Sequence, residues 1–398
     1  MKSLFRRPVV WLALPLLALP LLLAGPAQAA RHPAPAKAKI KARAKAKAEA
    51  EAKAEAKPKL VKKTPPRAPR PEPAALRGYF SQWKEVGDFL DEVAAKHGFE
   101  RATLQTLIDQ VRYVDTTVQL MKPQPPGKPK NWQAYRQRFV EPVRLQAGLA
   151  FWREHADALA RAESQFGVPA DIIVGIIGVE TVYGRNPGRF RVLDALTTLA
   201  FAYPDSANRV ARMAFFRGEL ENTLLLARQN DIDPLSLLGS YAGAVGMPQF
   251  MPSNIIKFGL DFDGDGQVDL RGSATDAIGS VANFLIQHGW RRDDPRQAVY
   301  PAIVSPDRSW EPFLNQGLEA KFSAEDLLAG GVSASAAIPA GGLFGLIDLQ
   351  NAGDPTEFCL ATNNFFAITQ YNRSYFYAMS VIELGQAVRQ ARDNLSGM

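Results

Sequence analysis

The stretch GVPADIIVGIIGVETVYGR, residues 167–185, leads from a helix-starting turn through a long apolar run to a carboxylate. Pro169 suits the first turn of a helix because it has no N–H to lose, and Asp171 suits the positive end of the helix dipole. The run from Ile172 to Val179 is almost unbroken in its apolar character. Glu180 follows it directly, and a glutamate is seldom fully buried unless it is paired or has a use for a perturbed pKa. Glu180 is therefore the first candidate for a functional residue.

The chain around this stretch has a mainly helical pattern from residue 78 onward. Apolar residues recur every three or four positions in 80–99 and 101–114, and one long amphipathic helix is predicted over 141–167. Further helices are predicted over 207–228, 274–288 and 374–394. Between Trp290 and Gln350 the chain is rich in Pro, Gly and Ser with short apolar runs, which indicates a small strand-bearing insertion. The fold class expected is mainly α (α+β).

The first residues have the three parts of a secretory signal peptide, which we place at residues 1–29. Lys2, Arg6 and Arg7 precede the apolar run Val9–Leu23, and Ala27-Gln28-Ala29 forms a small-x-small cleavage site. The alternative is an anchor that is never cut, but the run is short for a span of roughly 20 residues. The sequence thus predicts export, to the periplasm of a Gram-negative cell. The only cysteine, Cys359, is far from the cleavage site, so a lipoprotein is not expected, and we predict an inert buried thiol.

Residues 30–77 have the composition of a linker, with Ala/Lys/Glu repeats followed by a Pro/Arg-rich part. Residues 31–70 hold fourteen Lys or Arg and three Glu, a charge of +11, and the signal peptide adds +3. Since the whole chain is +7, residues 71–398 carry −7. An acidic body with a basic tail is a poor match to nucleic-acid binding, which we do not expect. The tail is either a solvated spacer or a contact with an anionic surface, such as membrane lipid or cell-wall carboxylates.

Two further segments have the composition of a sugar-binding groove. GSYAGAVGMPQFMPSN, residues 239–254, is rich in the Gly, Ala and Pro of loops, and NNFFAITQYNRSYFYA, residues 363–378, combines tyrosines with amides. Aromatic rings stack on sugar faces, and amides bond N-acetyl and hydroxyl groups. Taken singly, a tyrosine cluster is more often packing and a Gln-Phe-Met run is more often core. We expect both segments to converge on Glu180.

Together these motifs resemble the lytic murein transglycosylases of the membrane-bound B type, whose catalytic core is related to goose-type lysozyme. The resemblance covers 78–398, and VLDALTTLAFAYP, DFDGDGQVDL and DAIGSVANFLIQHGW add to it in the family's order. It implies a monomer with a lysozyme-like core. Its parts are a helical N-terminal part at 78–145, the catalytic core at 146–290, a small antiparallel β subdomain at 291–355, and a C-terminal segment at 356–398 that completes the cleft.

The resemblance also implies roles for particular residues. Glu180 is the catalytic acid/base, and the substrate-binding residues are Tyr135, Ser240, Gln249, Tyr371, Asn372 and Tyr377. Two positions depart from the family's pattern, because Met247 and Phe284 stand where tyrosines are expected. These substitutions affect individual sugar contacts and leave the chemistry intact.

The implied reaction cleaves the bond between N-acetylmuramic acid and N-acetylglucosamine in peptidoglycan without water and leaves a 1,6-anhydro end. A glycosidase usually shows two carboxylates, but the acids downstream of Glu180 have surface or capping contexts: Asp194, Asp205, Glu219 and Glu221. The family uses the substrate's own C6 hydroxyl and N-acetyl group instead. The alternatives are a hydrolytic muramidase and a non-catalytic peptidoglycan-binding scaffold, in which Glu180 pairs with Arg185 or Arg189.

DFDGDGQVDL, residues 261–270, opens like an EF-hand calcium loop, with acids at positions one, three and five and glycine at six. Gly272 occupies the place of the usual bidentate glutamate, and the resemblance supplies Asp276 instead. The predicted ligands are Asp261, Asp263, Asp265, Gln267 and Asp276. The alternative is an Asp/Gly-rich turn without an ion. Calcium would brace the loop, and no cofactor is expected for the chemistry.

Overall fold

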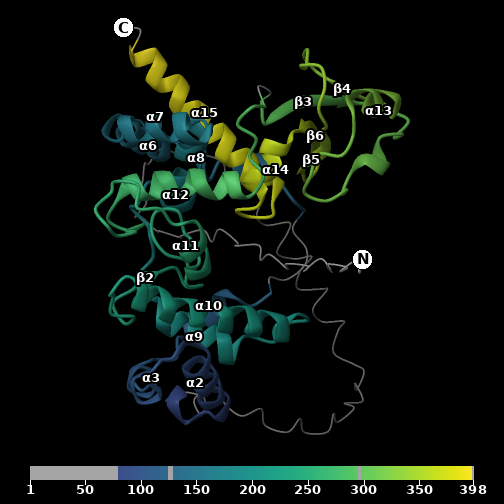
Figure 1. Ribbon diagram of the computed structural model, residues 1–398. Coiled ribbons are helices and arrows are strands. Elements are labelled where there is room, and N and C mark those ends of the chain that lie inside the picture. Colours follow the sequence, from purple (N-terminus) through teal and green to yellow (C-terminus); the bar gives the residue numbers. More distant parts are fainter. Residues whose placement is uncertain (1–78, 124–128, 295–296, 397–398) are drawn as a thin grey trace, which may run out of the picture. The chain divides into compact units, whose positions relative to one another are not determined.

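The structure is a computed structural model that describes residues 79–123, 129–294 and 297–396. The predicted signal peptide and linker lie outside these residues. Figure 1 shows a mainly helical protein with a small antiparallel sheet, which confirms the predicted fold class. Among the described residues no single helix is both long and apolar enough to cross a membrane. Helices α7 (Ala156–Phe166) and α8 (Ala170–Thr181) pass that test only as a pair bent by 118°.

The N-terminal part consists of short helices that bury one face each. Its elements are η2 (Phe80–Gln82), α2 (Lys84–His97), α3 (Arg101–Ile108), α4 (Asp115–Leu120) and α5 (Trp132–Arg136). In α2 the apolar spacing buries Val86, Phe89, Leu90 and Val93. The helix ends at Gly98, whose φ of 67° suits a left-handed C-cap.

The long helix predicted over 141–167 is wrong in one respect, because the segment forms two helices, α6 (Pro142–Glu154) and α7 (Ala156–Phe166). His155 separates them with φ −114° and ψ 27°, outside the helical region. The physical reason is packing: α6 lies against α8 and α15, whereas α7 lies mainly against α12. One straight helix could not bury both apolar faces, and the periodicity alone does not reveal the change of partner.

Helices α8 (Ala170–Thr181) and α15 (Tyr375–Ser396) form the central pair of the core. The side chains of α8 are buried from Ala170 to Val179, as the apolar run predicts. Gly175 allows the close approach of the two helices, since a Cβ there would lie 2.2 Å from the carbonyl oxygen of Val381. Figure 1 shows α15 (yellow) running beside α8.

The remaining core elements are α9 (Val192–Ala202), α10 (Arg209–Gln229), α11 (Pro252–Phe258), α12 (Ala274–Gln287), α14 (Asn363–Thr369) and a two-stranded pairing of β1 (Phe190–Arg191) with β2 (Leu238–Gly239). Of these, α12 and α14 contact the central pair, whereas α9 and α10 pack mainly on each other. The predicted helices over 207–228, 274–288 and 374–394 are therefore present as α10, α12 and α15.

The predicted insertion contains a four-stranded antiparallel sheet of order β4-β3-β6-β5. Its elements are β3 (Val299–Val304), η3 (Glu311–Phe313), α13 (Ala324–Ala329), β4 (Val332–Ala334), β5 (Gly345–Asn351) and β6 (Asp354–Ala361). Strand β6 runs past residue 355, where the sequence suggested the boundary of the subdomain. Cys359 lies buried in β6, and burial raises the pKa of its thiol to about 12.

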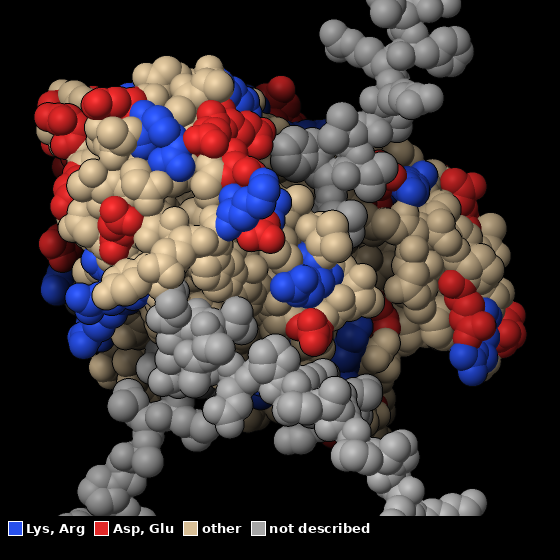
Figure 2. Space-filling view, turned by 90° about the horizontal axis from the view of Figure 1, so that it is seen from below, with Lys and Arg blue, Asp and Glu red and all other residues tan. Residues whose placement is uncertain are grey.

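Charged side chains of both signs are interspersed on the face shown in Figure 2. Acidic and basic groups also meet in ion pairs, for example between Lys96 and Glu221. A continuous positive surface attracts polyanions, whereas a surface of mixed charge does not. The visible face therefore carries no continuous basic patch.

Candidate active site

The turn after α8 fixes the position of Glu180. Val182, Tyr183 and Gly184 have φ values of 53°, 57° and 80°, so the chain reverses through three left-handed residues. Such conformations are costly for non-glycine residues and persist where the surroundings impose them. Thr181 supplies one such restraint: its Oγ1 donates to the carbonyl of Met247 at 2.8 Å and accepts from the N–H of Gly184 at 3.0 Å.

The ring of Tyr183 anchors the same turn in the core. A Cβ at Gly148 or at Gly178 would lie 2.5 Å from its hydroxyl, so only glycine on α6 and α8 leaves room for the ring. The ring also packs on Phe151 at a centroid distance of 5.2 Å. The turn that carries Glu180 is thus fixed by the hydrogen bonds of Thr181 and by the packing of the Tyr183 ring.

The carboxyl group of Glu180 lies in an apolar setting that favours its neutral form. Its neighbours Val179 and Thr181 are buried, while Glu180 keeps part of its surface exposed. Burial raises its pKa to about 7, and a hydrogen bond from Tyr377 opposes this rise. The Tyr377 hydroxyl donates to Oε1 at 2.7 Å. Glu180 can therefore be protonated near neutral pH.

The pairing of Glu180 with Arg185 or Arg189, which the scaffold alternative requires, is wrong. Both arginines are exposed, and neither contacts Glu180. The only hydrogen bond of the Glu180 carboxyl to a described residue is the one from Tyr377. Among the described residues no positively charged side chain pairs with the Glu180 carboxylate, so nothing of this kind offsets the rise of its pKa.

Three of the predicted tyrosines gather around Glu180. Tyr371 stacks on Tyr377 with ring centroids 6.2 Å apart and an interplanar angle of 17°, and its hydroxyl donates to the carbonyl of Pro248 at 2.9 Å. Tyr135 comes from α5, where its ring contacts Phe376 at 5.5 Å. Burial and the nearby Glu180 charge raise the pKa of Tyr135 to about 12, and they raise the pKa values of Tyr371 and Tyr377 as well.

The other predicted contacts lie in loops and make bonds of their own. Ser240 Oγ accepts from the N–H of Ala244 at 3.0 Å, and Gln249 Nε2 donates to the carbonyls of Gly246 at 2.9 Å and Pro187 at 3.2 Å. Both side chains are partly exposed, while Asn372 is buried. Neither Ser240 nor Gln249 makes a hydrogen bond to Glu180. The loop of Ser240 and Gln249 is joined to α8 through the bond from Thr181 to Met247.

An aromatic layer behind Tyr371 was not predicted from the sequence. Phe284 packs against Tyr371 at 4.7 Å, against His288 at 3.9 Å and against Phe250 at 5.5 Å. Phe284 is 3% exposed, so at this position, where the family pattern led us to expect a tyrosine, the ring supports Tyr371 from inside. The apolar periodicity of residues 274–288 could have placed Phe284 on a buried face.

Three of the acids considered as partners for Glu180 have structural contacts elsewhere, and the fourth lies exposed at the surface. Asp194 pairs with Arg191 at 2.7 Å, and Glu219 accepts from Ser253 at the start of α11. Glu221 pairs with Lys96, and Asp205 has an 88% exposed side chain. Among the described residues no second carboxylate contributes to the pKa of Glu180.

Three of the five predicted calcium ligands form a cluster. Carboxylate oxygens of Asp261, Asp263 and Asp276 lie within 4.8 Å of one another. Asp276 is buried in the first turn of α12, where its oxygens accept from the N–H groups of Phe262, Asp263 and Asp269. Asp265 and Gln267 are exposed on the same loop, outside this cluster. Convergent carboxylates on a glycine-containing loop fit a hard cation.

Comparison with known proteins agrees with this geometry. The family model described as "Transglycosylase SLT domain" matches residues 80–386. The chain is 41% identical over 325 residues to membrane-bound lytic murein transglycosylase B of Escherichia coli (strain K12), covering 80% of this chain and 86% of that protein.

Solved structures give the same relationship. The Escherichia coli lytic transglycosylase SLT35 in complex with bulgecin A is 42% identical with a TM-score of 0.71, over 79% of this chain and 96% of that one. SLT35 has also been solved in complex with calcium, with a TM-score of 0.69 over the same shares of the two chains. SltB3 from Pseudomonas aeruginosa, in complex with NAG-NAM-pentapeptide, is 27% identical with a TM-score of 0.65, over 77% of this chain and 79% of that one.

A helical core that presents one glutamate of raised pKa among tyrosines defines a protein of the lysozyme-like class. Within that class the chain belongs to the Transglycosylase SLT domain family. The resemblance to B-type lytic murein transglycosylases is thereby confirmed.

Proposed function

We propose that this chain cleaves the MurNAc-β-1,4-GlcNAc bond of peptidoglycan without water and leaves 1,6-anhydroMurNAc ends, with Glu180 as the acid and then the base. One observation carries the proposal: Glu180 has a pKa of about 7 and no second carboxylate close by among the described residues. A hydrolase of the usual kind needs two carboxylates. A single one suits a reaction in which the substrate supplies its own nucleophile.

In the first step Glu180 is the general acid. With a pKa of about 7 a large fraction of the group is protonated at neutral pH. Tyr377 occupies Oε1, which leaves Oε2 as the oxygen that carries and donates the proton. The proton passes to the bridging glycosidic oxygen, the bond from this oxygen to the anomeric carbon of MurNAc breaks, and GlcNAc leaves with the proton. The N-acetyl group of MurNAc shares the positive charge that develops.

In the second step the ionised Glu180 is the general base. The Tyr377 hydroxyl stabilises this ionised form through its 2.7 Å bond. Glu180 takes the proton of the C6 hydroxyl of the same MurNAc, and the C6 oxygen bonds to the anomeric carbon. The carboxyl is again protonated, no water is consumed, and the ring closes as the 1,6-anhydro sugar.

The surrounding side chains would bind the sugars. Tyr135 and Tyr371 offer aromatic faces near Glu180, as the shared influence of its charge on their pKa values indicates. Ser240, Gln249 and Asn372 are proposed as contacts for hydroxyl and N-acetyl groups. The relative SltB3 has been solved with NAG-NAM-pentapeptide, a ligand of this chemistry.

We also propose a structural calcium ion held by Asp261, Asp263 and Asp276, with Asp265 and Gln267 as further oxygen donors. Calcium takes six to eight oxygen ligands, which backbone carbonyls and water complete. The ion would neutralise acids that otherwise repel each other and would brace the loop before α12. The relative SLT35 has been solved in complex with calcium.

The proposed site of action is the periplasm, where the substrate lies. The signal-like residues 1–29 support export, and the basic linker at 30–77 would keep the enzyme near anionic lipid or cell wall. The relative from Escherichia coli is named as membrane-bound. We propose that the chain acts as a monomer.

The decisive experiment is mass spectrometry of the soluble products after the mature protein is incubated with purified peptidoglycan. Fragments one water lighter than lysozyme products support the proposal, and Glu180→Gln should abolish their release while glycan binding remains. Reducing-end fragments would instead identify a hydrolytic muramidase. A folded protein that binds peptidoglycan but releases no fragments would be a scaffold.

A further inference from the structure

One pocket in the described part of the chain does not contain Glu180. Its volume is about 650 Å³, and it lies between the start of α8, the second half of α15 and the segment that leads from α12 to β3. Asp171 lines it, whereas Glu180 lies about 13 Å further along the α8 axis, at 1.5 Å per residue. The pocket is therefore a separate feature that the proposed reaction does not use.

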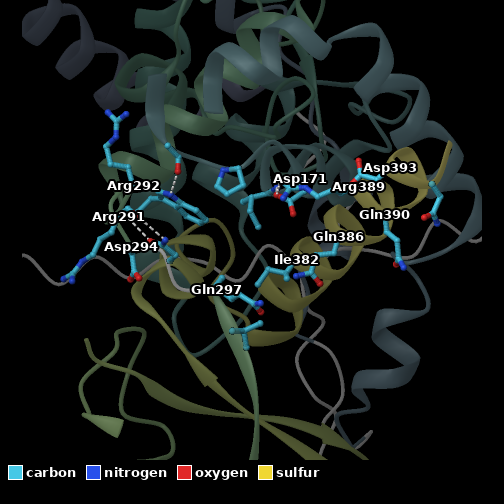
Figure 3. A pocket seen from close by; sticks show the side chains of 18 residues that line it. Asp171, Arg291, Arg292, Asp294, Gln297, Ile382, Gln386, Arg389, Gln390 and Asp393 are labelled. Carbon is cyan, nitrogen blue, oxygen red and sulfur yellow. Dashed lines mark hydrogen bonds and ion pairs between the residues drawn. The ribbon is translucent and has the colours of Figure 1, made fainter. Parts of the chain in front are cut away.

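One wall of the pocket presents side-chain amides that have no hydrogen-bond partner among the described residues. Gln386 and Gln390 are one helical turn apart on α15, and Gln297 precedes β3 (Figure 3). All three are exposed, and their side chains make no hydrogen bond to another described residue. Each amide offers donors and an acceptor, which matches the alternating N–H and C=O groups of a peptide.

Arg389 of α15 lines the pocket on one side, together with Asp171, Asp294 and Asp393. Arg291 and Arg292 lie on the opposite side in Figure 3, with their side chains extending away from the pocket. Arg389 bonds the buried Asp171 through Nη2 at 2.9 Å, yet its side chain is 38% exposed, so donors of its five N–H groups remain available. A planar guanidinium is well suited to a carboxylate ligand.

The floor between these groups is apolar and lacks an open aromatic face. Ile172, Ile382 and Val299 contribute small aliphatic surfaces. Trp290 is only 7% exposed, and its Nε1 donates to the carbonyl of Gly167, so its ring is part of the core. A sugar ring would lack a stacking platform here, whereas methyl-sized side chains between amides and carboxylates would fit.

We infer that this pocket is a second peptidoglycan-binding site that takes the peptide stem of a muropeptide, with Gln386 and Gln390 bonding the stem backbone and Arg389 its carboxylate. The inference rests on the proposed function, because the substrate carries such stems. A five-residue stem spans at most about 17 Å. Since α8 fills the core between the two sites, a stem whose sugar lies at Glu180 would have to run around the domain. The pocket therefore takes the stem of another sugar unit.

A second contact of this kind raises the effective concentration of substrate at the catalytic site. Only peptide-bearing peptidoglycan gains from this contact, because a glycan without stems cannot bind the pocket. A change in the pocket should therefore affect the two substrates differently, whereas a general effect on catalysis would affect both.

The test compares Gln386→Ala/Gln390→Ala with the control Gln146→Ala/Gln229→Ala, which changes exposed helical glutamines outside the pocket. Both are made in a Glu180→Gln background, and calorimetry measures the Kd of a synthetic pentapeptide stem. We expect the pocket variant to bind at least tenfold more weakly, while the control binds like the parent. Equal Kd values in the pocket variant and the parent would overturn the inference, and so would weaker binding of stem-free glycan by the pocket variant.

The active enzyme supplies the second readout. With Glu180 intact, the pocket variant should release fragments more slowly from peptide-bearing peptidoglycan and at the parental rate from stem-free glycan. Equal slowing on both substrates would overturn the inference. If the parent cleaves neither substrate, the proposed function fails, and the pentapeptide Kd still decides whether the pocket binds stems.

Discussion

The Tyr377 hydroxyl donates a hydrogen bond of 2.7 Å to Oε1 of Glu180, a residue 197 positions away in the sequence. The bond favours the ionised carboxylate, and burial favours the neutral acid. Because burial is the larger effect, the pKa is raised to about 7 and no further. The two influences together suit a group that must donate a proton and then take one back.

Tyr377→Phe should raise the pKa of Glu180, because the bond that stabilises its ionised form is removed. The alkaline limb of the kcat/KM profile should move to higher pH. The maximal rate should fall by roughly ten- to a hundredfold, since a bond to a charged group contributes about 1.5–3 kcal/mol. A pH–rate profile on purified peptidoglycan measures both. Tyr375→Phe is the control, because that hydroxyl bonds the carbonyl of Gly317 on the β subdomain side. An unshifted limb in Tyr377→Phe contradicts the assigned role.

Glu180→Gln should stabilise the fold at neutral and alkaline pH. The native pKa is raised from 4.5 to about 7, so the native state holds the proton more tightly than the unfolded chain. Wild-type stability therefore falls as pH rises from about 4.5 to about 7 and is constant above that. The amide of the Glu180→Gln variant does not titrate, so this variant does not lose stability in this way. Its free energy of unfolding relative to the wild type should rise between about pH 4.5 and about pH 7, by up to roughly 3 kcal/mol.

Urea unfolding of wild type and Glu180→Gln at pH 4.5 and pH 8 checks the sign. Glu221→Gln is an informative control. Burial opposes the shift, but the hydrogen bonds and ion pairs with Lys96 and His97 together outweigh it and lower the pKa of Glu221. The stability difference between this variant and the wild type should therefore change with pH in the opposite direction. A stability difference for Glu180→Gln that is independent of pH would show that the carboxyl is not perturbed by burial.

Gly175→Ala should destabilise the protein although alanine is the better helix former. The added Cβ would lie 2.2 Å from the carbonyl oxygen and 3.0 Å from the carbonyl carbon of Val381, so α8 and α15 must separate. Overpacking of this kind costs roughly 1–3 kcal/mol. The matched control is Gly218→Ala in α10, where nothing lies within 4 Å and a gain of up to about 1 kcal/mol is expected. Chemical denaturation that ranks the two variants in the reverse order would refute the close packing of the helices.

Calcium should raise the melting temperature of the wild type after chelation, on the order of 5 °C at saturating concentration, because it binds only the folded loop. Asp261→Asn should abolish most of this rise, since it removes one charge of the three-carboxylate cluster. Asp269→Asn is the control, an exposed aspartate of the same loop outside the cluster. Thermal scans with and without excess calcium decide the matter, and equal rises in all three proteins would exclude this cluster as the site.

Local features of the site were readable from the sequence because they depend on neighbours in the chain. The apolar run before Glu180 predicts a buried helix that ends on an acid, and α8 has this form. The spacing of Asp261 and Asp263 on a glycine-rich loop likewise points to converging oxygens, two of the three in the cluster. The division of residues 141–167 at His155 was missed, because periodicity records that a face is apolar and not which helix covers it.

The sequence by itself therefore determined which residue types lie on which element: a glutamate after an apolar helix, tyrosines near the C-terminal helix, acids on a tight loop. Only the tertiary structure decided which of them meet. It places the Tyr377 hydroxyl against Glu180, brings Tyr135 of α5 close to the same carboxyl, and pairs Glu219 with Ser253. The physical reason is that a pKa depends on burial and on charges a few ångströms away. Such neighbours come from distant parts of the chain and are set by how α8 and α15 pack, which spacing along the sequence does not encode.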